Sequence, residues 1–274
     1  MLAVAYQGER GAYSEEAVYT HFGPDVKAVP CRTIREVFNN TEARTVDYGV
    51  VPVENSIEGS VSETYDMFLT SSVKVVGEII LRISHCLIVN PETELKDIRL
   101  VYSHPQALAQ CRGFIASLGA ELVTTYDTAG SVRLIKDKGL RDAAAIASEK
   151  AAEIYGMRVL ARGIEDYGRN YTRFLVISTR EAESSKDSKT SIIFSTAHIP
   201  GALYHALGAF ANNGLNLTKI ESRPTRQRPW EYYFFVDFEG HQDDERSRKA
   251  LSELASKVIF LKVLGSYPRA RVEL

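Results

Sequence analysis

Residues 100–118 read Leu-Val-Tyr-Ser-His-Pro-Gln-Ala-Leu-Ala-Gln-Cys-Arg-Gly-Phe-Ile-Ala-Ser-Leu, which predicts a short strand at 100–102 and a helix at 105–118. Short apolar runs alternate with helical patterns on both sides of this stretch. Further strands are predicted at 2–6, 27–31, 48–53, 121–125, 143–147, 158–161 and 173–178, and further helices at 14–22, 129–138, 149–155 and from Thr33 onward. Strands that alternate with helices predict an α/β domain with parallel sheets.

A long β-rich run at residues 73–89 interrupts this alternation and reads as two strands. An extended segment midway through the pattern predicts two lobes that are joined by crossovers. Because ligands of open α/β sheets bind beyond the carboxyl ends of the strands, we expect a ligand between the lobes.

The chain divides near residue 185, where residues 181–190 read Glu-Ala-Glu-Ser-Ser-Lys-Asp-Ser-Lys-Thr. This polar stretch is typical of a linker. The residues after it predict the element order βαββαβ, which is the ferredoxin-like arrangement. We therefore predict a first domain at 1–180, a linker at 181–189 and an α+β domain at 190–274. The open edge of such a sheet predicts pairing with a second copy of the chain.

Composition excludes several classes of protein. Of the 274 residues, 45% are apolar and 25% are charged, which argues against a disordered chain. Lys plus Arg is 33 and Asp plus Glu is 35, so no strongly basic field exists for nucleic acid or for an anionic membrane. No apolar run approaches the ~20 residues of a membrane helix, and the N-terminus lacks a secretory signal. Three widely spaced cysteines, Cys31, Cys86 and Cys111, predict a reduced cytoplasmic protein with no structural metal.

Four loops combine helix starts with small polar side chains. They span residues 8–14, 54–61, 103–106 and 128–131. Free backbone N–H groups at such positions bind carboxylates without a lysine. For any one loop an ordinary helix cap is the favoured interpretation. Four of them at strand ends in one domain favour an anion-binding cleft.

Residues 170–174 read Asn-Tyr-Thr-Arg-Phe and lead from a glycine-containing loop into an apolar strand. Arg173 could clamp a carboxylate with two parallel hydrogen bonds, or it could be an ordinary edge residue. The pattern alone does not decide between these two roles of Arg173.

The six histidines show no metal-ligand spacing. Only His104, which precedes Pro105 at a helix start, is a candidate for function.

Six motifs in this order resemble the prephenate dehydratase family with a C-terminal ACT regulatory domain. They lie at residues 6–14, 52–60, 103–108 and 172–174 in the first region and at 201–204 and 221–224 in the second. The resemblance covers essentially the whole chain. It implies a type 2 periplasmic-binding-protein-like two-lobed domain followed by a ferredoxin-like ACT domain. No chorismate mutase segment precedes residue 1, so we expect a monofunctional enzyme.

The resemblance implies decarboxylating dehydration of prephenate to phenylpyruvate, with no cofactor and no metal. Thr172 is the implied catalytic residue, as a hydrogen-bond donor to the departing hydroxyl or as a proton relay, because a threonine is too weak an acid for simple general-acid catalysis. Arg173 is expected to grip the side-chain carboxylate. The remaining substrate-binding candidates are Ser14, Asn55, Ser56, Ser60, Ser103, His104, Gln106, Asn170 and Phe174.

For the second domain, the resemblance implies feedback regulation by L-phenylalanine and assembly into a homodimer or homotetramer through ACT domains. The candidate effector residues are Gly201, Ala202, Leu203, Glu221 and Ser222. Tyr204 stands where the family often has valine, which leaves the effector's affinity and identity open. Three alternatives remain: an arogenate dehydratase, a non-catalytic binding module like the solute receptors, and an amino-acid sensor without chemistry.

Overall fold

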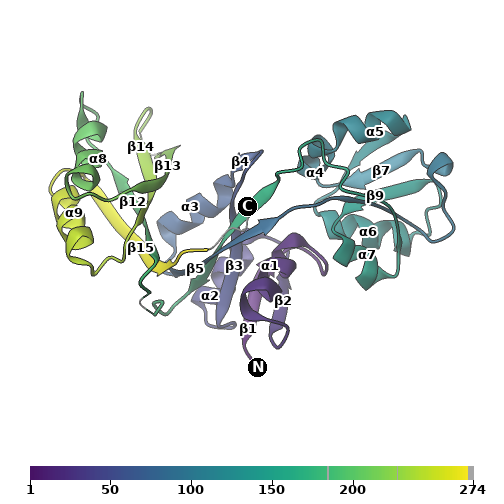
Figure 1. Ribbon diagram of the computed structural model, residues 1–274, viewed down its shortest axis with the longest axis horizontal. Coiled ribbons are helices and arrows are strands. Elements are labelled where there is room, and N and C mark those ends of the chain that lie inside the picture. The colour runs from purple at the N-terminus through teal and green to yellow at the C-terminus, as the bar shows by residue number, and fades with distance from the viewer. Residues whose placement is uncertain (184, 227, 271–274) are drawn as a thin grey trace. The chain divides into compact units, whose positions relative to one another are not determined.

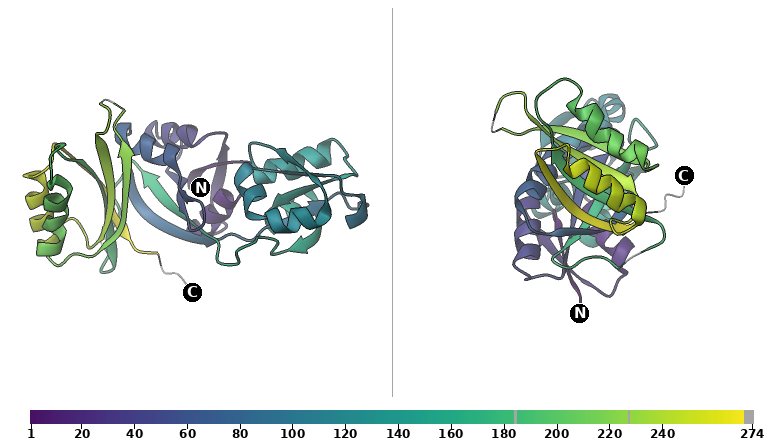
Figure 2. Two further views of the ribbon diagram at one scale, coloured as in Figure 1. Left: turned by 90° about the horizontal axis from the view of Figure 1, so that it is seen from above. Right: turned by 90° about the vertical axis from the view of Figure 1, so that its left-hand side faces the viewer.

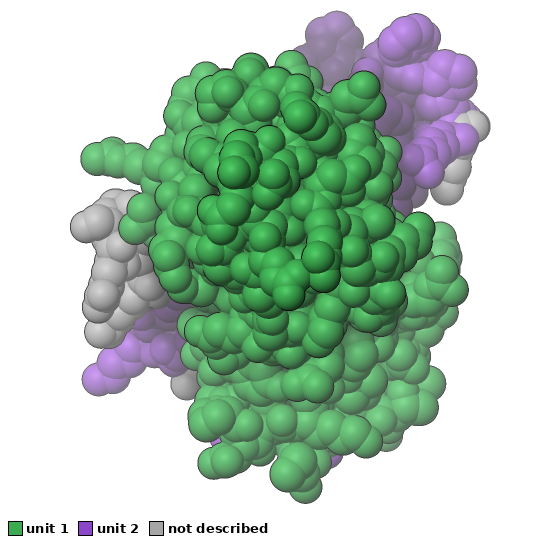
Figure 3. All heavy atoms as spheres, turned by 90° about the vertical axis from the view of Figure 1, so that its right-hand side faces the viewer, with its two compact units in different colours: residues 1–64, 79–174 green, residues 65–78, 175–274 purple. Residues whose placement is uncertain are grey.

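The computed structural model describes residues 1–183, 185–226 and 228–270, which form two compact units (Figure 3). The first unit comprises residues 1–64 and 79–174, and the second comprises residues 65–78 and 175–274. Ser184, in the predicted linker, and residues 271–274, at the end of the predicted second domain, lie outside the described residues. The domain limits at 180 and 190 stay a prediction.

The first sheet has the strand order β2-β1-β3-β11-β5, with a short β4 paired to β3. Strand β1 runs parallel to both β2 and β3, as the strand–helix alternation predicts. Strands β5 and β11 each run from one unit into the other. The elements of this part are β1 (Ala3–Gln7), α1 (Tyr13–Phe22), β2 (Lys27–Cys31), α2 (Ile34–Glu42), β3 (Tyr48–Asn55), β4 (Gly59–Ser60), α3 (Ser62–Thr70), β5 (Lys74–Arg82) and β11 (Tyr171–Ser178).

The second sheet has the order β10-β6-β9-β7-β8 and is covered on both faces. Strand β9 reads Ala-Ala-Ala-Ile-Ala and is wholly buried; alternate residues face helices α6 and α7 on one side and α4 and α5 on the other. The elements are β6 (Cys86–Val89), η1 (Leu95–Asp97), β7 (Leu100–Ser103), α4 (Pro105–Gln110), α5 (Arg112–Leu118), β8 (Glu121–Thr124), α6 (Thr128–Asp137), β9 (Ala143–Ala147), α7 (Glu149–Tyr155) and β10 (Arg158–Arg162).

The prediction of purely parallel sheets is wrong for this second sheet. Strand β7 is parallel to β8 and β9, but β6 is antiparallel to both β9 and β10. The chain enters through β6 and leaves after β10, so these strands belong to the two crossovers and not to the βαβ repeats. The two strands predicted at 73–89 are found as β5 and β6, and the two-lobed α/β architecture is confirmed.

The helix predicted at 105–118 is broken at Cys111, whose φ of −119° and ψ of 24° are not helical. The Gln110 carbonyl accepts a hydrogen bond from the Asp166 backbone N–H at 2.7 Å, and the Asp166 carboxylate accepts one from the Gly113 N–H at 3.1 Å. A loop far away in the sequence therefore takes over hydrogen bonds of the helix, which no local pattern could reveal.

Gly11 brings the two lobes of the first unit into contact. Its φ is +86°, and a Cβ on it would lie 2.7 Å from the Cα of Ala151 at the start of α7. The Gly11 carbonyl also accepts a hydrogen bond from Ser148 Oγ at 2.7 Å. The left-handed conformation and the close approach both require glycine at this position.

The C-terminal sheet has the order β13-β14-β12-β15, and helices α8 and α9 cover one of its faces (Figures 1 and 2). Its elements are β12 (Ser188–Ser195), α8 (Ala202–Asn212), β13 (Leu217–Pro224), β14 (Tyr232–Glu239), α9 (Glu245–Ala255) and β15 (Phe260–Pro268). This order is the predicted ferredoxin-like βαββαβ arrangement. Strand β13 is an edge strand whose residues alternate between half-buried and exposed.

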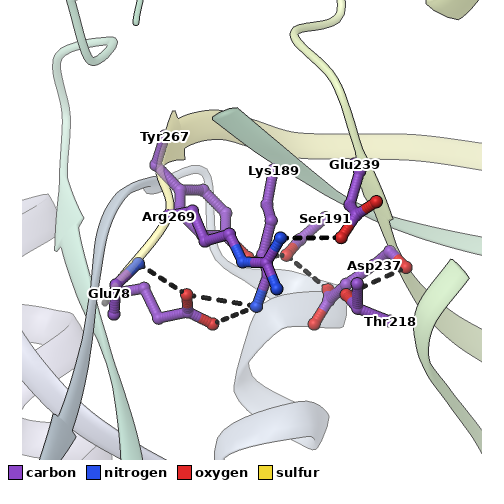
Figure 4. Close-up of polar contacts among 9 residues, drawn as sticks. Glu78, Lys189, Ser191, Thr218, Asp237, Glu239, Tyr267 and Arg269 are labelled. Carbon is purple, nitrogen blue, oxygen red and sulfur yellow. Dashed lines mark hydrogen bonds and ion pairs between the residues drawn. The ribbon is translucent and has the colours of Figure 1, made fainter. Parts of the chain in front are cut away.

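A buried ion pair ties β5 to this C-terminal sheet within the second unit (Figure 4). The side chains of Glu78 and Lys189 are 0% and 10% exposed, and the Lys189 Nζ lies 2.9 and 3.1 Å from the two carboxylate oxygens. The Ala270 N–H donates a third hydrogen bond to Glu78 at 3.0 Å. Each charge is thus paired and hydrogen-bonded, which offsets much of the cost of burying it.

No helix of the described residues is long and apolar enough to cross a membrane. Cys31, Cys86 and Cys111 are free and buried. Burial raises the pKa of the Cys86 thiol to about 11, so this thiol is protonated at neutral pH.

Breaking the buried pair should destabilise the protein strongly. We expect Glu78→Gln or Lys189→Met to lower the free energy of unfolding by roughly 3–5 kcal/mol, because each leaves one partner buried without its counter-charge. The double variant Glu78→Met/Lys189→Met should recover part of the loss. Urea denaturation measures all three. Lys249→Met, which breaks the exposed Glu245–Lys249 pair, is the control and should change little; equal losses in control and test would contradict the expectation.

Candidate functional site

A cavity of about 370 Å³ lies in the first unit. Helix starts and the ends of strands from both of its sheets line this cavity. The lining residues are Gln7, Tyr13, Ser14, Arg32, Thr33, Ile34, Pro52, Asn55, Val61, Glu63, Ile83, His85, His104, Gln106, Ala107, Gln110, Thr128, Thr172 and Phe174.

All four loops that combine a helix start with small polar side chains reach this cavity. Each contributes a lining residue: Ser14, Asn55, His104 and Thr128. Helix α2 adds a further start, where the Thr33 side chain accepts the Glu36 N–H at 3.1 Å. Thr33 and Glu36 do not form a complete capping box, because the Glu36 carboxylate accepts from the N–H of Arg32 and not of Thr33.

Thr172 lies on β11 and faces the cavity, as does Phe174 two residues later. Successive side chains of a strand point to opposite faces, so the half-buried Arg173 lies on the other face of β11. Arg173 is not among the lining residues, and its expected role as the carboxylate anchor stays a prediction.

The hydrogen bonds of Asn55 fix the direction of the Thr172 hydroxyl. Asn55 Oδ1 accepts the backbone N–H groups of Ile57 and Glu58 at 2.9 and 3.0 Å. The amide nitrogen must then face β11, where it donates to Thr172 Oγ1 at 3.0 Å. Because this oxygen accepts the bond, the hydroxyl hydrogen of Thr172 is not donated to Asn55 and can be donated to another acceptor.

Asn170, which does not line the cavity, helps to hold the side-chain amide of Asn55 in this orientation. It is 0% exposed, accepts from Asn55 Nδ2 at 2.7 Å and donates to Gln110 Oε1 at 2.8 Å. Gln110 is the last residue of α4, directly before the helix break at Cys111. Asn170, expected as a substrate-binding residue, is a hydrogen-bond partner of Asn55 and is not among the lining residues.

Three predicted serines do not line the cavity. Ser103 is fully buried and donates to the Ile146 carbonyl at 2.6 Å. Ser56 donates to the Arg169 carbonyl at 3.2 Å and accepts the Tyr171 N–H at 2.9 Å. Ser60 lies in β4 beside Glu54. Ser103 and Ser56 therefore hold the loops in place, while Ser14, His104 and Gln106 stay candidates for direct contact.

Sequence reasoning missed the two charged residues of the cavity. Among the described residues that line it, Arg32 is the one permanent cation and Glu63 the one acid. Arg32 stands directly before the Thr33 cap, so its place at a helix start could have been noticed. Glu63 carries no comparable signal.

The two histidines of the cavity, His85 and His104, are neutral at physiological pH. Burial lowers the pKa of both imidazoles. His104 Nδ1 accepts the Gln106 N–H at 3.3 Å and so caps α4. The described residues contain no group of three or more His, Cys, Asp or Glu side chains that could hold a metal ion.

A second cavity, of about 390 Å³, lies in the second unit. Ala202 and Leu203 at the start of α8 line it, together with residues 196–200, 230–232 and 234. The predicted effector residues Gly201, Glu221 and Ser222 are not among its lining residues. Tyr204 also lies outside it and is 77% exposed.

Two curated relatives span nearly the whole chain. A bifunctional chorismate mutase/prephenate dehydratase of Aquifex aeolicus is 46% identical, over 99% of this chain and 75% of the relative. An arogenate dehydratase/prephenate dehydratase of Arabidopsis thaliana is 45% identical, over 97% of this chain and 72% of the relative.

Two solved structures are similar in fold. A prephenate dehydratase from Arthrobacter aurescens in complex with L-Phe is 33% identical, with a TM-score of 0.89 over 98% of this chain and 90% of the other. A protein described as a novel type of quorum quenching acylase is 34% identical, with a TM-score of 0.89 over 98% of both chains.

Family models agree with these similarities. The model for prephenate dehydratase matches residues 4–182, and the model for the ACT domain matches residues 190–256. The chain therefore belongs to the prephenate dehydratase family and carries a C-terminal ACT domain.

Proposed function

We propose that the protein converts prephenate to phenylpyruvate and that L-phenylalanine regulates it by feedback. The observation that carries the proposal is the Thr172 hydroxyl, which accepts from Asn55 and can therefore donate into the cavity. Family membership supports the same reaction.

The reaction requires a proton at the departing oxygen. The bond between the ring and its carboxylate breaks to release carbon dioxide, and its electron pair enters the ring. The ring hydroxyl then leaves with a proton as water, and aromatisation drives the reaction. Thr172 donates a hydrogen bond to that hydroxyl, and one well-aimed donor in a cavity lowers the barrier by about 3–4 kcal/mol. The proton itself comes from solvent, because a threonine is too weak an acid.

The two carboxylates of prephenate have different partners in this proposal. Arg32 binds one of them, because it is the one permanent cation among the described lining residues. The helix starts at Ser14 and Thr128 supply backbone N–H groups for the other. Arg173 is the second candidate for the first carboxylate, but its side chain would have to turn from the other face of β11 to reach the cavity.

Arogenate is the alternative substrate. It carries an ammonium group in place of the keto group of prephenate, and Glu63 could pair with that ammonium from the cavity wall. The name of the Arabidopsis relative includes both dehydratase activities.

An acylase activity, which the description of one similar structure names, is less well supported. The Thr172 hydroxyl bonds to Asn55 and not to a histidine that could activate it as a nucleophile.

Regulation is assigned to the cavity of the second unit. Leu203 and Phe234 give it apolar walls that suit a phenyl group, and the start of α8 suits a carboxylate. The Arthrobacter relative was solved with L-Phe. Feedback requires that phenylalanine bind a less active state better than the active one. We also propose assembly through β13, which is an edge strand of the sheet formed by the described residues and therefore suits pairing with a second copy.

Removing the Thr172 hydroxyl should abolish most of the activity. We expect Thr172→Val to lower kcat by about 10²- to 10³-fold, which is the usual cost of one transition-state donor. Thr172→Ser keeps the hydroxyl and should retain far more. The assay follows aromatic product from prephenate and, separately, from arogenate. Near-normal turnover in Thr172→Val would remove Thr172 from the mechanism, and no product from either substrate with the wild type would favour a binding module or a sensor.

Arg32→Gln should raise KM for the dianionic substrate by about 10- to 100-fold, because it removes a charged hydrogen bond worth about 1.5–3 kcal/mol. Steady-state kinetics give KM and kcat. Arg35→Gln, three residues later in helix α2 and outside the cavity lining, is the matched control and should behave as the wild type. Arg173→Gln is the third variant: if it alone raised KM, the anchor would be Arg173 and the assignment to Arg32 would be wrong.

Leu203→Ala should weaken inhibition by phenylalanine about tenfold or more, because burying a leucine contributes about 1.5–3 kcal/mol. Basal turnover without phenylalanine should be unchanged. This point variant tests the effector site better than removal of the domain after residue 182. That truncation would also remove Lys189 and so leave Glu78 buried without its counter-charge. Tyr204→Val, outside the cavity, is the comparison. Full sensitivity in Leu203→Ala would refute this location of the effector site.

A further inference from the structure

His85 stands at the far end of the hydrogen-bond chain that reaches Thr172. Its ring is only 2% exposed, and its Nε2 lies 2.9 Å from Gln110 Oε1. The same oxygen of Gln110 accepts from Asn170. The chain therefore runs from His85 through Gln110, Asn170 and Asn55 to Thr172.

The direction of this chain determines the tautomer of His85. The backbone N–H groups of residues 57 and 58 orient Asn55, which orients Asn170, which in turn fixes the oxygen of Gln110 towards His85. A carbonyl oxygen only accepts hydrogen bonds, so His85 carries its hydrogen on Nε2. The reverse orientation of Gln110 would place two amide donors against each other.

Other contacts hold the ring and backbone of His85 in place. Its Nδ1 lies 3.0 Å from the Tyr13 hydroxyl, whose single hydrogen is shared with the Ser84 carbonyl at 2.7 Å. The rings of Tyr13 and His85 meet edge to face at 5.5 Å. The His85 backbone N–H donates to the Glu165 carboxylate at 2.9 Å. Both ring nitrogens of His85 thus face protein side chains, those of Gln110 and Tyr13.

We propose that His85 is a positioning residue for this reaction, one that acts on Thr172 through Gln110, Asn170 and Asn55. Its Nε2–H holds the Gln110 oxygen where Asn170 can donate to it. Without that donor, Gln110 can turn its amide, and Asn55 is no longer constrained to donate to Thr172. The proposal rests on the proposed function for its kinetic consequence, but the hydrogen-bond chain can be tested without substrate.

The kinetic test compares three replacements of His85. His85→Leu removes both nitrogens and should lower kcat on the order of 10- to 100-fold with KM nearly unchanged, as misplacement of a catalytic group does. His85→Gln places an amide nitrogen near the position of Nε2 and should restore most of kcat, whereas His85→Asn, which reaches only as far as Nδ1, should not. His21→Leu, on the exposed side of α1, is the control. Equal kcat in the Gln and Asn variants would overturn the proposal.

A double-mutant cycle separates positioning from a general structural effect. In a Thr172→Val background, His85→Leu should cause no further loss of kcat, because the hydroxyl that it positions is already absent. Additive losses would show that His85 acts independently of Thr172 and would overturn the proposal.

Nuclear magnetic resonance tests the chain without turnover. In the wild type, His85 should show a protonated Nε2 and an unprotonated Nδ1, and the side-chain amide signals of Asn55 and Asn170 should shift in His85→Leu and return in His85→Gln. A protonated Nδ1 with a bare Nε2, or unchanged amide signals, would refute the role of His85. If these signals behave as expected while the wild type turns over neither substrate, the proposed function fails and the positioning chain stands.

Discussion

Two backbone N–H groups at the end of β3 determine what Thr172 can do. Those of Ile57 and Glu58 occupy the side-chain oxygen of Asn55, so its amide nitrogen has to face β11. If the amide turned over, its oxygen would face Asn170 Oδ1 and its nitrogen would face two N–H groups. Both contacts are repulsive. A turn of the main chain thus decides that the Thr172 oxygen accepts and that its hydrogen is free to be donated.

The crossover between β10 and β11 joins this turn to the second sheet. Its Asp166 interrupts the helix at residues 105–118, and its Asn170 bonds to both Asn55 and Gln110. The same segment therefore bonds to the helix at its break and to the side chain of Gln110, the last residue before the break. A buried amide network is favourable only if every member is satisfied, and Asn55, Asn170 and Gln110 supply one another's partners.

Local sequence patterns predicted most of the helices and strands. Apolar alternation in strands, helix-capping residues and glycines at helix ends each depend on only a few neighbouring residues. The candidates Ser14, Asn55, His104, Gln106, Thr172 and Phe174 all line one cavity, since helix starts and strand ends converge in α/β folds. Patterns failed where the cause lies far away in the sequence. The break at Cys111, the antiparallel β6, the cavity cation Arg32 and the partnership of His85 with Gln110 all depend on tertiary contacts.

The sparse charge of the cavity suits the proposed chemistry. A carboxylate that leaves as carbon dioxide loses its charge on the way, so a tightly paired cation would stabilise the ground state more than the transition state and slow the step. The side-chain carboxylate keeps its charge, and a cation can hold it without that penalty. One arginine for two carboxylates, with His85 and His104 kept neutral by burial, satisfies both requirements. A second cation in the cavity should therefore tighten binding and slow turnover.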